Sequence, residues 1–478
     1  MSVSKEELVR NYTKAIREGN AAVFAGAGLS SSSGLVNWKE LLRPLAKDIN
    51  LDVDKEEHDL LSVAQFYKDQ RSTRSGINQK IMEAFSKNVE PNENIRVLAR
   101  LPIFTYWTTN YDKLLEDGIK EANRNPDVKI QSSQLSNSKP DRDCVVFKMH
   151  GDVDFPENAV LTREDYETYG NKRSLFRTAL QGDLISKEFL FIGFSFEDPN
   201  LAYILAQIHS LLDDNVRDHY CFFKRVQRDD YPDDGEFKYD LAKQEMKVEN
   251  LTHYGIQTVY VDDYSEITDI LHEIEKASKL KNVFISGSAS AYQAPWTKDS
   301  AEELAGKLSG ALVHGNCRIT SGFGLGIGSA VINGALNVIY ADKYRHVDEH
   351  LCLRPFPQNV TGAERTAIYK KYREDMLSEA GIAIFIFGNK KDSSGNIITA
   401  PGCLDEYHIA KAEGNCIIPI GSTGYAAKDI YDEVKTEMVV DPDAYPYLKG
   451  YIDDLGSVTD IDKLVRIVVE IVRKISEL

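Results

Sequence analysis

The sequence predicts an α/β protein with two Rossmann-like domains, each built on a mostly parallel sheet. Short apolar runs end in glycine or in polar turns, and segments with the period of a helix lie between them. The same alternation restarts near residue 282. Strands that alternate with helices favour a parallel sheet covered on both faces, so we expect one domain over residues 1–281 and a second over residues 282–478.

In the first domain, an amphipathic helix over residues 3–18 begins with a Ser4–Glu7 capping box. Buried strands are expected at the apolar runs Ala21–Ala25, Pro102–Trp107, Val145–Met149, Phe189–Gly193, His219–Phe223 and Thr258–Val261. Helical segments between them include Trp38–Ile49, Leu60–Lys68 and Pro199–Leu212. The charge-rich segment Asp229–Glu249 predicts a solvent-exposed helix or excursion, and a helix over Glu266–Lys281 ends the domain.

The second domain begins with a strand that runs from Val283 into the turn Ser286–Ser288. Further strands are expected at Arg318–Ser321, Ile382–Phe387 and Cys416–Ile420. An apolar helix over Ala330–Tyr340 follows a glycine-rich turn, and the chain ends in an amphipathic helix over Asp460–Leu478.

The composition excludes several classes of protein. The 478 residues carry 57 Lys and Arg against 74 Asp and Glu, a net charge of −17, whereas a protein that binds DNA or RNA needs a cationic face. No two of the six cysteines have a CxxC spacing, so we expect reduced thiols and no metal. The N-terminus lacks the apolar segment of a signal peptide and no apolar run could span a bilayer, which predicts a cytoplasmic protein without a membrane partner.

The turn Gly26–Ser30 follows directly on the first buried strand. Glycine lets the backbone turn sharply and approach a phosphate closely, and the N-terminus of the following helix adds partial positive charge. Taken alone, this turn is as consistent with tight packing as with phosphate binding.

Three further polar turns follow predicted strands. Thr108–Asp112 brings an amide, Asn110, and a carboxylate, Asp112, to a strand end, where open α/β sheets bind ligands. Lys148–Asp152 contains His150, the side chain best suited to general base catalysis at neutral pH. Gly193–Asn200 is a polar turn that could bind ribose hydroxyls.

The motifs GAGLSSSSG, TTNYD, MHGD and GFSFEDPN, in this order, resemble the sirtuin fold of NAD-consuming enzymes over roughly residues 15–270. The resemblance implies that NAD phosphates lie against Gly26, Ala27, Gly28 and Ser30. It also implies that Asn110, Asp112 and His150 line the nicotinamide-ribose pocket, and that Gly193 and Ser195 bind the adenosine side.

Two departures from protein deacetylases favour water as the acceptor. The four-cysteine zinc module of those enzymes is missing, and Asn37–Lys39 stands where they have Asp-Phe-Arg. The expected reaction is hydrolysis of NAD, the substrate, to nicotinamide and ADP-ribose. We assign His150 as the base for water or a ribose hydroxyl and Asn110 as the group that holds either one, while Asp112 orients the nicotinamide amide or caps a helix. A sirtuin-type deacylase or ADP-ribosyltransferase and a non-enzymatic nucleotide-binding scaffold are the alternatives.

A second glycine cluster lies in Ser321–Ser329, with glycine at every second position from 322 to 328 at the start of a helix. This bare backbone suits a phosphate or pyrophosphate, and Ser286–Ser288 is a second turn for the same pocket. The basic residues at nearby element edges are Arg354, Arg373 and Lys390, and Glu406 lies in the first turn of a later helix.

Residues 282–478 resemble the SLOG family of nucleotide sensors, with a damaged hydrolase motif, Pro401–Glu406, that favours sensing over catalysis. A sirtuin-like domain followed by a SLOG domain resembles the effectors of the Thoeris antiphage defence. The resemblance implies a homo-oligomer, expected to be a homotetramer, in which a cyclic ADP-ribose isomer from a TIR-domain partner enzyme binds the SLOG domain and activates NAD depletion. The residues expected to bind this signal are Gly287, Ser288, Gly322, Gly324, Arg354, Arg373, Lys390 and Glu406.

Overall fold

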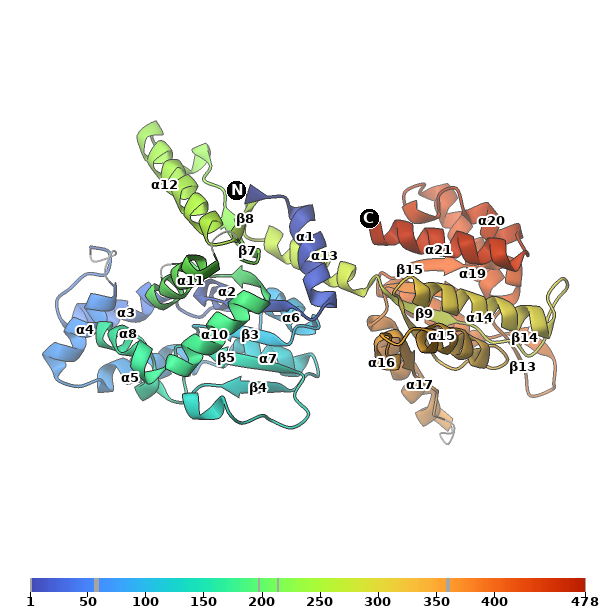
Figure 1. The fold of residues 1–478 in the computed structure, drawn as a ribbon, viewed down its shortest axis with the longest axis horizontal. Helices are drawn as coiled ribbons and strands as arrows, with labels where there is room; N and C mark the ends of the chain where they lie inside the picture. The colour runs from blue at the N-terminus through green and yellow to red at the C-terminus, as the bar shows by residue number, and fades with distance from the viewer. Residues whose placement is uncertain (1, 56–59, 197, 213–214, 358–361, 478) are drawn as a thin grey trace. The chain divides into compact units, whose positions relative to one another are not determined.

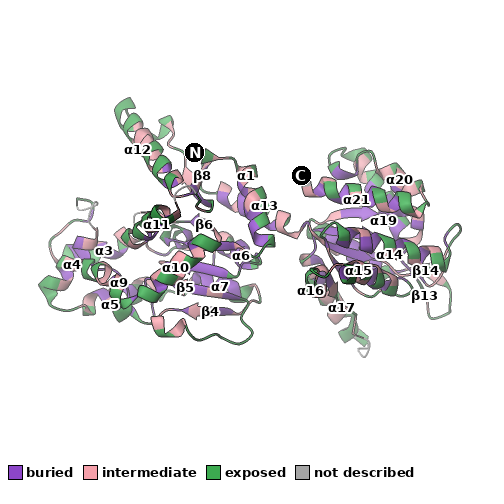
Figure 2. Cartoon of the chain, viewed as in Figure 1, coloured by how far each residue is buried: buried purple, intermediate pink, exposed green. Residues whose placement is uncertain are grey.

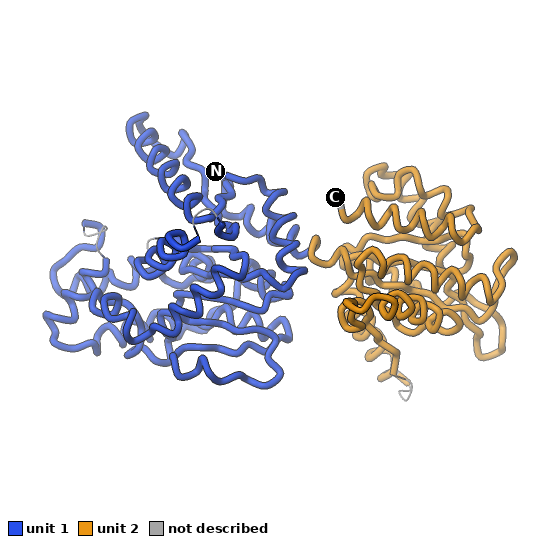
Figure 3. Tube along the Cα trace, in the orientation of Figure 1, with its two compact units in different colours: residues 1–275 blue, residues 276–478 orange. Residues whose placement is uncertain are grey.

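A computed structural model describes residues 2–55, 60–196, 198–212, 215–357 and 362–477 (Figure 1). Its contacts divide the chain into two compact units, Met1–Glu275 and Lys276–Leu478 (Figure 3). The division falls within α13 (Glu266–Lys279), whereas the predicted join at residue 282 is the first residue of β9 (Asn282–Ser286). Leu478, the predicted end of the last helix, and residue 197, in a predicted binding turn, lie outside the described ranges.

Unit 1 contains an eight-stranded sheet in the order β1-β8-β7-β6-β2-β3-β5-β4, with every neighbouring pair parallel. Its strands are β1 (Ser2–Val3), β2 (Ala21–Ala25), β3 (Thr105–Thr108), β4 (Pro126–Lys129), β5 (Cys144–Lys148), β6 (Glu188–Ile192), β7 (His219–Lys224) and β8 (Ile256–Val261). The six predicted strands are confirmed, Ala21–Ala25 with its predicted bounds and the other five with shifted ends, and the sequence prediction missed β1 and β4.

The sheet is buried on both faces, as the parallel arrangement requires. Along β2, Val23 and Ala25 belong to one hydrophobic cluster while Ala22 and Phe24 belong to another, because alternate residues of a strand point to opposite faces. Figure 2 shows the strands of the sheet in the colour of buried residues. The main helices of this unit are α1 (Lys5–Arg17), α2 (Ala27–Ser31), α3 (Trp38–Asp48), α4 (Leu60–Arg71), α5 (Ser75–Phe85), α6 (Glu93–Arg100), α7 (Leu114–Glu121), α8 (Arg163–Glu167), α9 (Tyr169–Lys172), α10 (Ser174–Ser186), α11 (Pro199–Leu212) and α12 (Asp234–His253).

Local sequence signals explain several of these helices. The Ser4 hydroxyl accepts a hydrogen bond from the backbone N–H of Glu7 at 3.1 Å, so Ser4 is the N-cap of α1 and one half of the predicted capping box is present. The charged segment forms α12, whose buried side chains are Val248 and Leu251. Helices α3, α4 and α5 form a small lobe with its own hydrophobic cluster.

Unit 2 contains a second parallel sheet in the order β11-β10-β9-β12-β15. The other strands of this sheet are β10 (Arg318–Ser321), β11 (Leu351–Leu353), β12 (Ile382–Phe385) and β15 (Cys416–Pro419), and β13 (Asn389–Lys391) pairs with β14 (Ile397–Thr399) as a hairpin. The main helices are α14 (Lys298–His314), α15 (Gly328–Ala341), α16 (Val347–His350), α17 (Gly362–Ser378), α18 (Pro401–Ala412), α19 (Tyr425–Val440), α20 (Ile452–Ser457) and α21 (Ile461–Glu477). The strand predicted to reach Phe387 ends earlier, and Phe387 itself has a left-handed backbone with φ of 56°.

Each sheet has a point where the strand order reverses. In unit 1, β2 has β3 on one side and β6 on the other, and in unit 2, β9 has β10 on one side and β12 on the other. Open α/β sheets bind ligands in the crevice at the carboxyl ends of the strands at such a point. The fold therefore places both predicted nucleotide turns, after β2 and after β9, at binding positions.

None of the helices in the described part of the chain is long and apolar enough to cross a bilayer.

Candidate functional site

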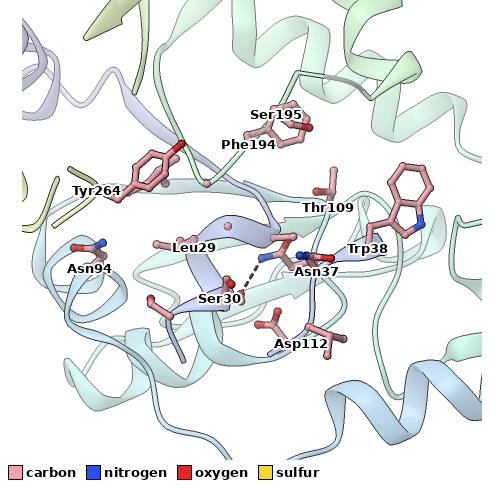
Figure 4. Close-up of a pocket in the computed structure, with 18 of the residues that line it drawn as sticks. Leu29, Ser30, Asn37, Trp38, Asn94, Thr109, Asp112, Phe194, Ser195 and Tyr264 are labelled. Carbon is pink, nitrogen blue, oxygen red and sulfur yellow. Dashed lines mark hydrogen bonds between the residues drawn. The ribbon is translucent and has the colours of Figure 1, made fainter. Parts of the chain in front are cut away.

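A cavity of about 1070 Å³ lies in unit 1 at the carboxyl ends of β2, β3, β5 and β6. Ligand pockets are typically about 300–1,000 Å³, so this one is large enough for a dinucleotide. The predicted residues that line it are Ala27, Gly28, Ser30, Asn110, Asp112, His150, Gly193 and Ser195. Figure 4 shows Trp38 and Tyr264 at opposite sides of the view, with Leu29 and Ser30 of α2 between them.

The two predicted glycine turns of unit 1 pack directly on each other. The backbone N–H of Gly28 donates to the carbonyl oxygen of Gly193 at 2.9 Å. A Cβ atom on Gly26 would lie 2.3 Å from that same oxygen, and one on Gly193 would lie 2.1 Å from the backbone nitrogen of Leu29. Gly26 is buried and does not itself line the cavity, and the close approach of the two backbones requires glycine at this position.

Replacing Gly193 with alanine should disturb this junction, because the residue has φ of +64° and no room for a Cβ atom. A positive φ costs an L-residue about 1–2 kcal/mol, and overpacking adds about 1–3 kcal/mol. We expect a lower urea midpoint of unfolding and a KM for NAD raised at least about tenfold. Gly34→Ala is the matched control, because Gly34 has φ of +85° with nothing within 4 Å, so it should show the backbone cost alone. Equal effects of the two variants would contradict the close packing.

Asn110 is held by hydrogen bonds that fix the orientation of its amide. Its Nδ2 donates to the carbonyl oxygen of Gly26 and to the Oγ of Ser30, both at 3.0 Å. Its backbone N–H donates to the Oγ1 of Thr108 at 2.9 Å. Since a carbonyl can only accept, the nitrogen must face Gly26, and the Oδ1 is the atom left to accept a hydrogen bond from water or ribose.

Asp112 lies at the start of α7 and also lines the cavity. Its Oδ1 accepts a hydrogen bond from the backbone N–H of Leu114 at 3.0 Å, which is the helix-end role that the sequence left open. Burial raises the pKa of Asp112, although Lys148 and the hydrogen bond from Leu114 oppose this rise. Contact with the nicotinamide amide stays a prediction.

Beneath these turns lies a buried ion-pair cluster that the sequence prediction missed. The Nζ of Lys148, which is fully buried, lies 2.9 Å from Oε1 of Glu116 and 2.5 Å from Oδ2 of Asp152. It also donates to the backbone carbonyls of Tyr111 and Asp112. The sequence did contain a signal for this cluster, because a lysine ends an apolar strand and an aspartate follows it four residues later. The cluster ties the turn after β5 to the turn that carries Asn110.

His150 is buried, with its ring edge-on to that of Tyr166 at a centroid distance of 5.5 Å. Its Nε2 lies 3.2 Å from Oδ2 of Asp198, a residue that the sequence prediction did not select. Burial lowers the pKa of His150, while the nearby charge of Asp198 opposes this shift and that of Arg173 adds to it. The imidazole is therefore neutral near pH 7 and able to accept a proton.

In unit 2, the loop after β9 and the glycine loop after β10 pack together. A Cβ atom on Gly324 would lie 1.8 Å from the carbonyl oxygen of Gly287, and the backbone N–H of Ala289 donates to the carbonyl oxygen of Leu325 at 2.7 Å. The Oγ of Ser288 donates to the carbonyl oxygen of Asn389 at 3.0 Å. The structure therefore brings Gly287, Ser288 and Gly324 together at one edge of the sheet.

Phe356 connects two more predicted residues, Arg373 and Gly322, and Arg373 in turn contacts a third, Glu406. The guanidinium of Arg373 lies 5.1 Å from the centre of the Phe356 ring, and a Cβ atom on Gly322 would lie 3.1 Å from the same ring. The Nε of Arg373 lies 3.5 Å from Oε1 of Glu406, whose Oε2 accepts a hydrogen bond from Ser286 at 2.6 Å. Burial raises the pKa of Glu406, against the effect of Ser286 and Arg373.

Arg354 and Lys390 have other surroundings. Arg354 pairs with Glu379 at 3.2 Å, and Lys390 is exposed on the β13–β14 hairpin. Next to Lys390, the fully buried Asn389 was missed by the sequence prediction. Its Oδ1 accepts hydrogen bonds from the backbone of Ser290 and Ala291 at 2.9 and 3.0 Å, so it fixes the loop after β9.

Within the described ranges, no group of three or more His, Cys, Asp or Glu side chains is arranged to hold a metal ion.

Comparison with known proteins identifies both units. A SIR2-like domain model matches residues 105–251, and the model of the Sir2- and TIR-associating SLOG family matches residues 266–475. The chain is 44% identical over 474 residues to the NAD(+) hydrolase ThsA of Bacillus cereus (strain MSX-D12), covering 98% of each chain. It is 41% identical over 486 residues to the NAD(+) hydrolase ThsA of Enterococcus faecium, covering 99% of this chain and 100% of the relative. It is also 23% identical over 280 residues to Defense-associated sirtuin 2 of Bacillus subtilis, covering 56% of this chain and 27% of that relative.

Proposed function

This chain belongs to the ThsA family of NAD(+) hydrolases, and we propose that Asn110 and His150 carry out the hydrolysis of NAD to nicotinamide and ADP-ribose in the cavity of unit 1. One observation carries the assignment: the cavity at the point of strand-order reversal joins two glycine turns to an oriented amide and a neutral, buried imidazole. The glycine turns leave room for the phosphates, and the polar side chains lie where the reacting ribose would be.

The chemistry needs little more than orientation and a base. The nicotinamide–ribose bond breaks with its electron pair leaving on the positively charged ring, and the ribose passes through an oxocarbenium-like state. The Oδ1 of Asn110 accepts a hydrogen bond from the attacking water. His150 takes the proton of that water as its oxygen bonds to the ribose carbon. The products are nicotinamide, ADP-ribose and one proton.

For unit 2 we propose that a cyclic ADP-ribose isomer, made by a TIR-domain partner enzyme, binds and activates a homotetramer that depletes NAD in antiphage defence. The match to the Sir2- and TIR-associating SLOG family and the likeness to a defence-associated sirtuin support this regulation. So does the position of Arg373, which packs on Phe356 next to Gly322 of the glycine loop, because a guanidinium binds phosphate well. A change of the active fraction from 1% to 99% needs about 5.5 kcal/mol of differential binding.

The direct test incubates the purified chain with NAD, with and without each cyclic ADP-ribose isomer, and follows nicotinamide and ADP-ribose by chromatography. We expect one isomer to increase hydrolysis strongly, and light scattering to show a tetramer. An arm with an acyl-lysine peptide detects deacylation. The absence of hydrolysis with every isomer would overturn the proposal for unit 2, and NAD turnover that depends on the peptide would overturn water as the acceptor.

Replacing Arg373 with alanine should raise the isomer concentration needed for half-maximal activation roughly 10- to 100-fold, since a hydrogen bond to a charged group contributes about 1.5–3 kcal/mol. Maximal hydrolysis at saturating isomer should be unchanged. Lys370→Ala is the matched control, because Lys370 is an exposed cation on the same helix, α17. The assignment fails if both variants are activated at the same concentration as the unaltered chain.

A further inference from the structure

The carboxylate of Asp198, which has no role in the mechanism proposed above, lies close to the ring of His150. Asp198 comes from the residue before α11, His150 from the turn after β5, and Tyr166 from α8. Oδ2 of Asp198 lies 3.2 Å from Nε2 of His150 and accepts a hydrogen bond from the Oη of Tyr166 at 3.1 Å. The side chains of His150 and Asp198 are only 5% and 7% exposed, so water screens their interaction little.

The carboxylate cannot turn away from the imidazole. While Oδ2 accepts from Tyr166, Oδ1 accepts hydrogen bonds from the backbone N–H groups of Asn200 and Leu201, both at 3.0 Å. These two bonds make Asp198 the N-cap of α11. Burial and the charge of Asp198 raise the pKa of Tyr166 well above 10, so its hydroxyl remains a donor. Because three donors hold this carboxylate in place, it can fix the orientation of the His150 ring.

We propose that Asp198 is a positioning residue for NAD hydrolysis, which keeps the proton of neutral His150 on Nε2 and leaves Nδ1 to accept the proton of water. A lone pair on Nε2 within 3.2 Å of a carboxylate oxygen would be repelled by it, so the tautomer with hydrogen on Nε2 is favoured. The inference rests on the proposed role of His150 as the base.

The same contact stabilises the charged ring that forms during the reaction. When Nδ1 takes the proton of water, the hydroxyl oxygen bonds to the ribose carbon and nicotinamide leaves with the electron pair of the broken bond. The Nε2 of the imidazolium then lies 3.2 Å from Oδ2 of Asp198, which is ion-pair distance, although in the structure Nε2 is not aligned for a hydrogen bond and has no hydrogen-bond partner among the described residues. Charge on the ring turns this contact into a buried ion pair, which a rotation of the ring would convert into a charge-assisted hydrogen bond.

Among the charges that act on His150, that of Asp198 has the largest effect. Asp165 favours the charged ring, and Arg173 disfavours it. Asp165 is itself paired with Arg74 at 2.7 Å. The ring of Tyr169 packs edge-on against the imidazole at a centroid distance of 6.2 Å and adds no charge.

The experiment replaces Asp198 with asparagine and measures kcat and KM for NAD against pH, under conditions in which the unaltered chain hydrolyses NAD. Asparagine is as good an N-cap as aspartate, so α11 should remain intact. Its Nδ2 would donate to Nε2 and thus move the ring proton to Nδ1, so we expect kcat to fall about 10²- to 10⁴-fold with little change in KM. The acid limb of the kcat profile should move to lower pH, because the charge that favours the imidazolium is lost.

Two further variants separate the possible outcomes. Asp183→Asn is the matched control, because Asp183 accepts a hydrogen bond from Nε1 of Trp107 at 2.8 Å in the same unit, and its kcat should be unchanged. Tyr166→Phe keeps the charge of Asp198 and should lose at most about tenfold in kcat. If Asp198→Asn keeps the kcat and the acid limb of the unaltered chain while His150→Ala is inactive, the positioning role is overturned and the proposed function stands. If His150→Ala remains active, the proposed function itself fails.

Discussion

Replacing His150 with alanine should lower the turnover of NAD by about 10²- to 10⁴-fold, the range that a positioned general base contributes. The ring lines the same cavity as Asn110, and its lowered pKa keeps it in the proton-accepting form. Because alanine leaves the glycine turns in place, KM for NAD should change much less than kcat. Initial rates of nicotinamide release over a range of NAD concentrations separate the two.

The control for this variant is His209→Ala, since His209 lies on α11 beside His253, at a ring centroid distance of 3.9 Å. It removes an imidazole from the same unit at a position that does not line the cavity, and turnover should be retained. Comparable rates for His150→Ala and the unaltered chain would show that another group accepts the proton.

The pH dependence of NAD turnover and of stability follows from the lowered pKa of His150. Burial lowers the pKa of His150 below its ordinary value of 6.5, so kcat should stay level from pH 8 down to about 6.5 and fall at more acidic pH. At acidic pH the unfolded chain binds more protons at His150 than the folded chain does. The contribution of neutral His150 to the free energy of unfolding is therefore fully present above pH 6.5 and decreases as pH falls below that value. His219, whose pKa burial lowers to about 3, acts in the same direction. Rates and urea midpoints measured between pH 5 and 8 test both statements.

Site residues that directly follow a strand could be predicted from the sequence. Contacts between side chains from separate elements could not. Asn110 and His150 each come directly after an apolar run, and topology alone brings parallel strand ends to one edge. Asp198 meets His150 only because α11 starts beside the turn after β5, and no spacing in the sequence encodes that distance. Strand β4 was missed for a related reason: its Asp127 and Lys129 are buried as a pair 2.8 Å apart, so its sequence is not an apolar run.

Unit 2 shows the same division. The glycine loop and the turn after β9 were predictable because close backbone packing needs glycine, and the two loops indeed touch. The roles of the single basic residues could not be predicted in the same way, because a position at the end of a helix or strand does not determine which groups the side chain contacts. Arg373 packs on Phe356, whereas Arg354 pairs with Glu379 and Lys390 extends from a hairpin. Hydrogen bonds that fix a loop, such as those of Asn389, depend on which backbone groups lie opposite.

Replacing Lys148 with methionine should lower the free energy of unfolding by about 3–5 kcal/mol, the cost of removing one partner from a buried ion pair. Burial alone would lower the pKa of this lysine, but the charges of Glu116 and Asp152 outweigh burial and raise it. Without the cation, two carboxylates are left in a site that excludes water, and the turn that carries Asn110 loses its anchor at the carbonyls of Tyr111 and Asp112. Urea unfolding followed by circular dichroism measures the change.

A triple variant makes the cause testable. Adding Glu116→Gln and Asp152→Asn to Lys148→Met removes the uncompensated charge while keeping the shape, so part of the lost stability should return. Lys129→Met is the matched comparison, because Lys129 is also buried and paired, but with Asp127, which Arg142 contacts as well at 3.0 Å. That second cation should make the Lys129 variant the less destabilised of the two. If the triple variant is no more stable than Lys148→Met, the loss of stability comes from packing of the lysine stem rather than from the buried charges. NAD turnover in the two variants should then be equal.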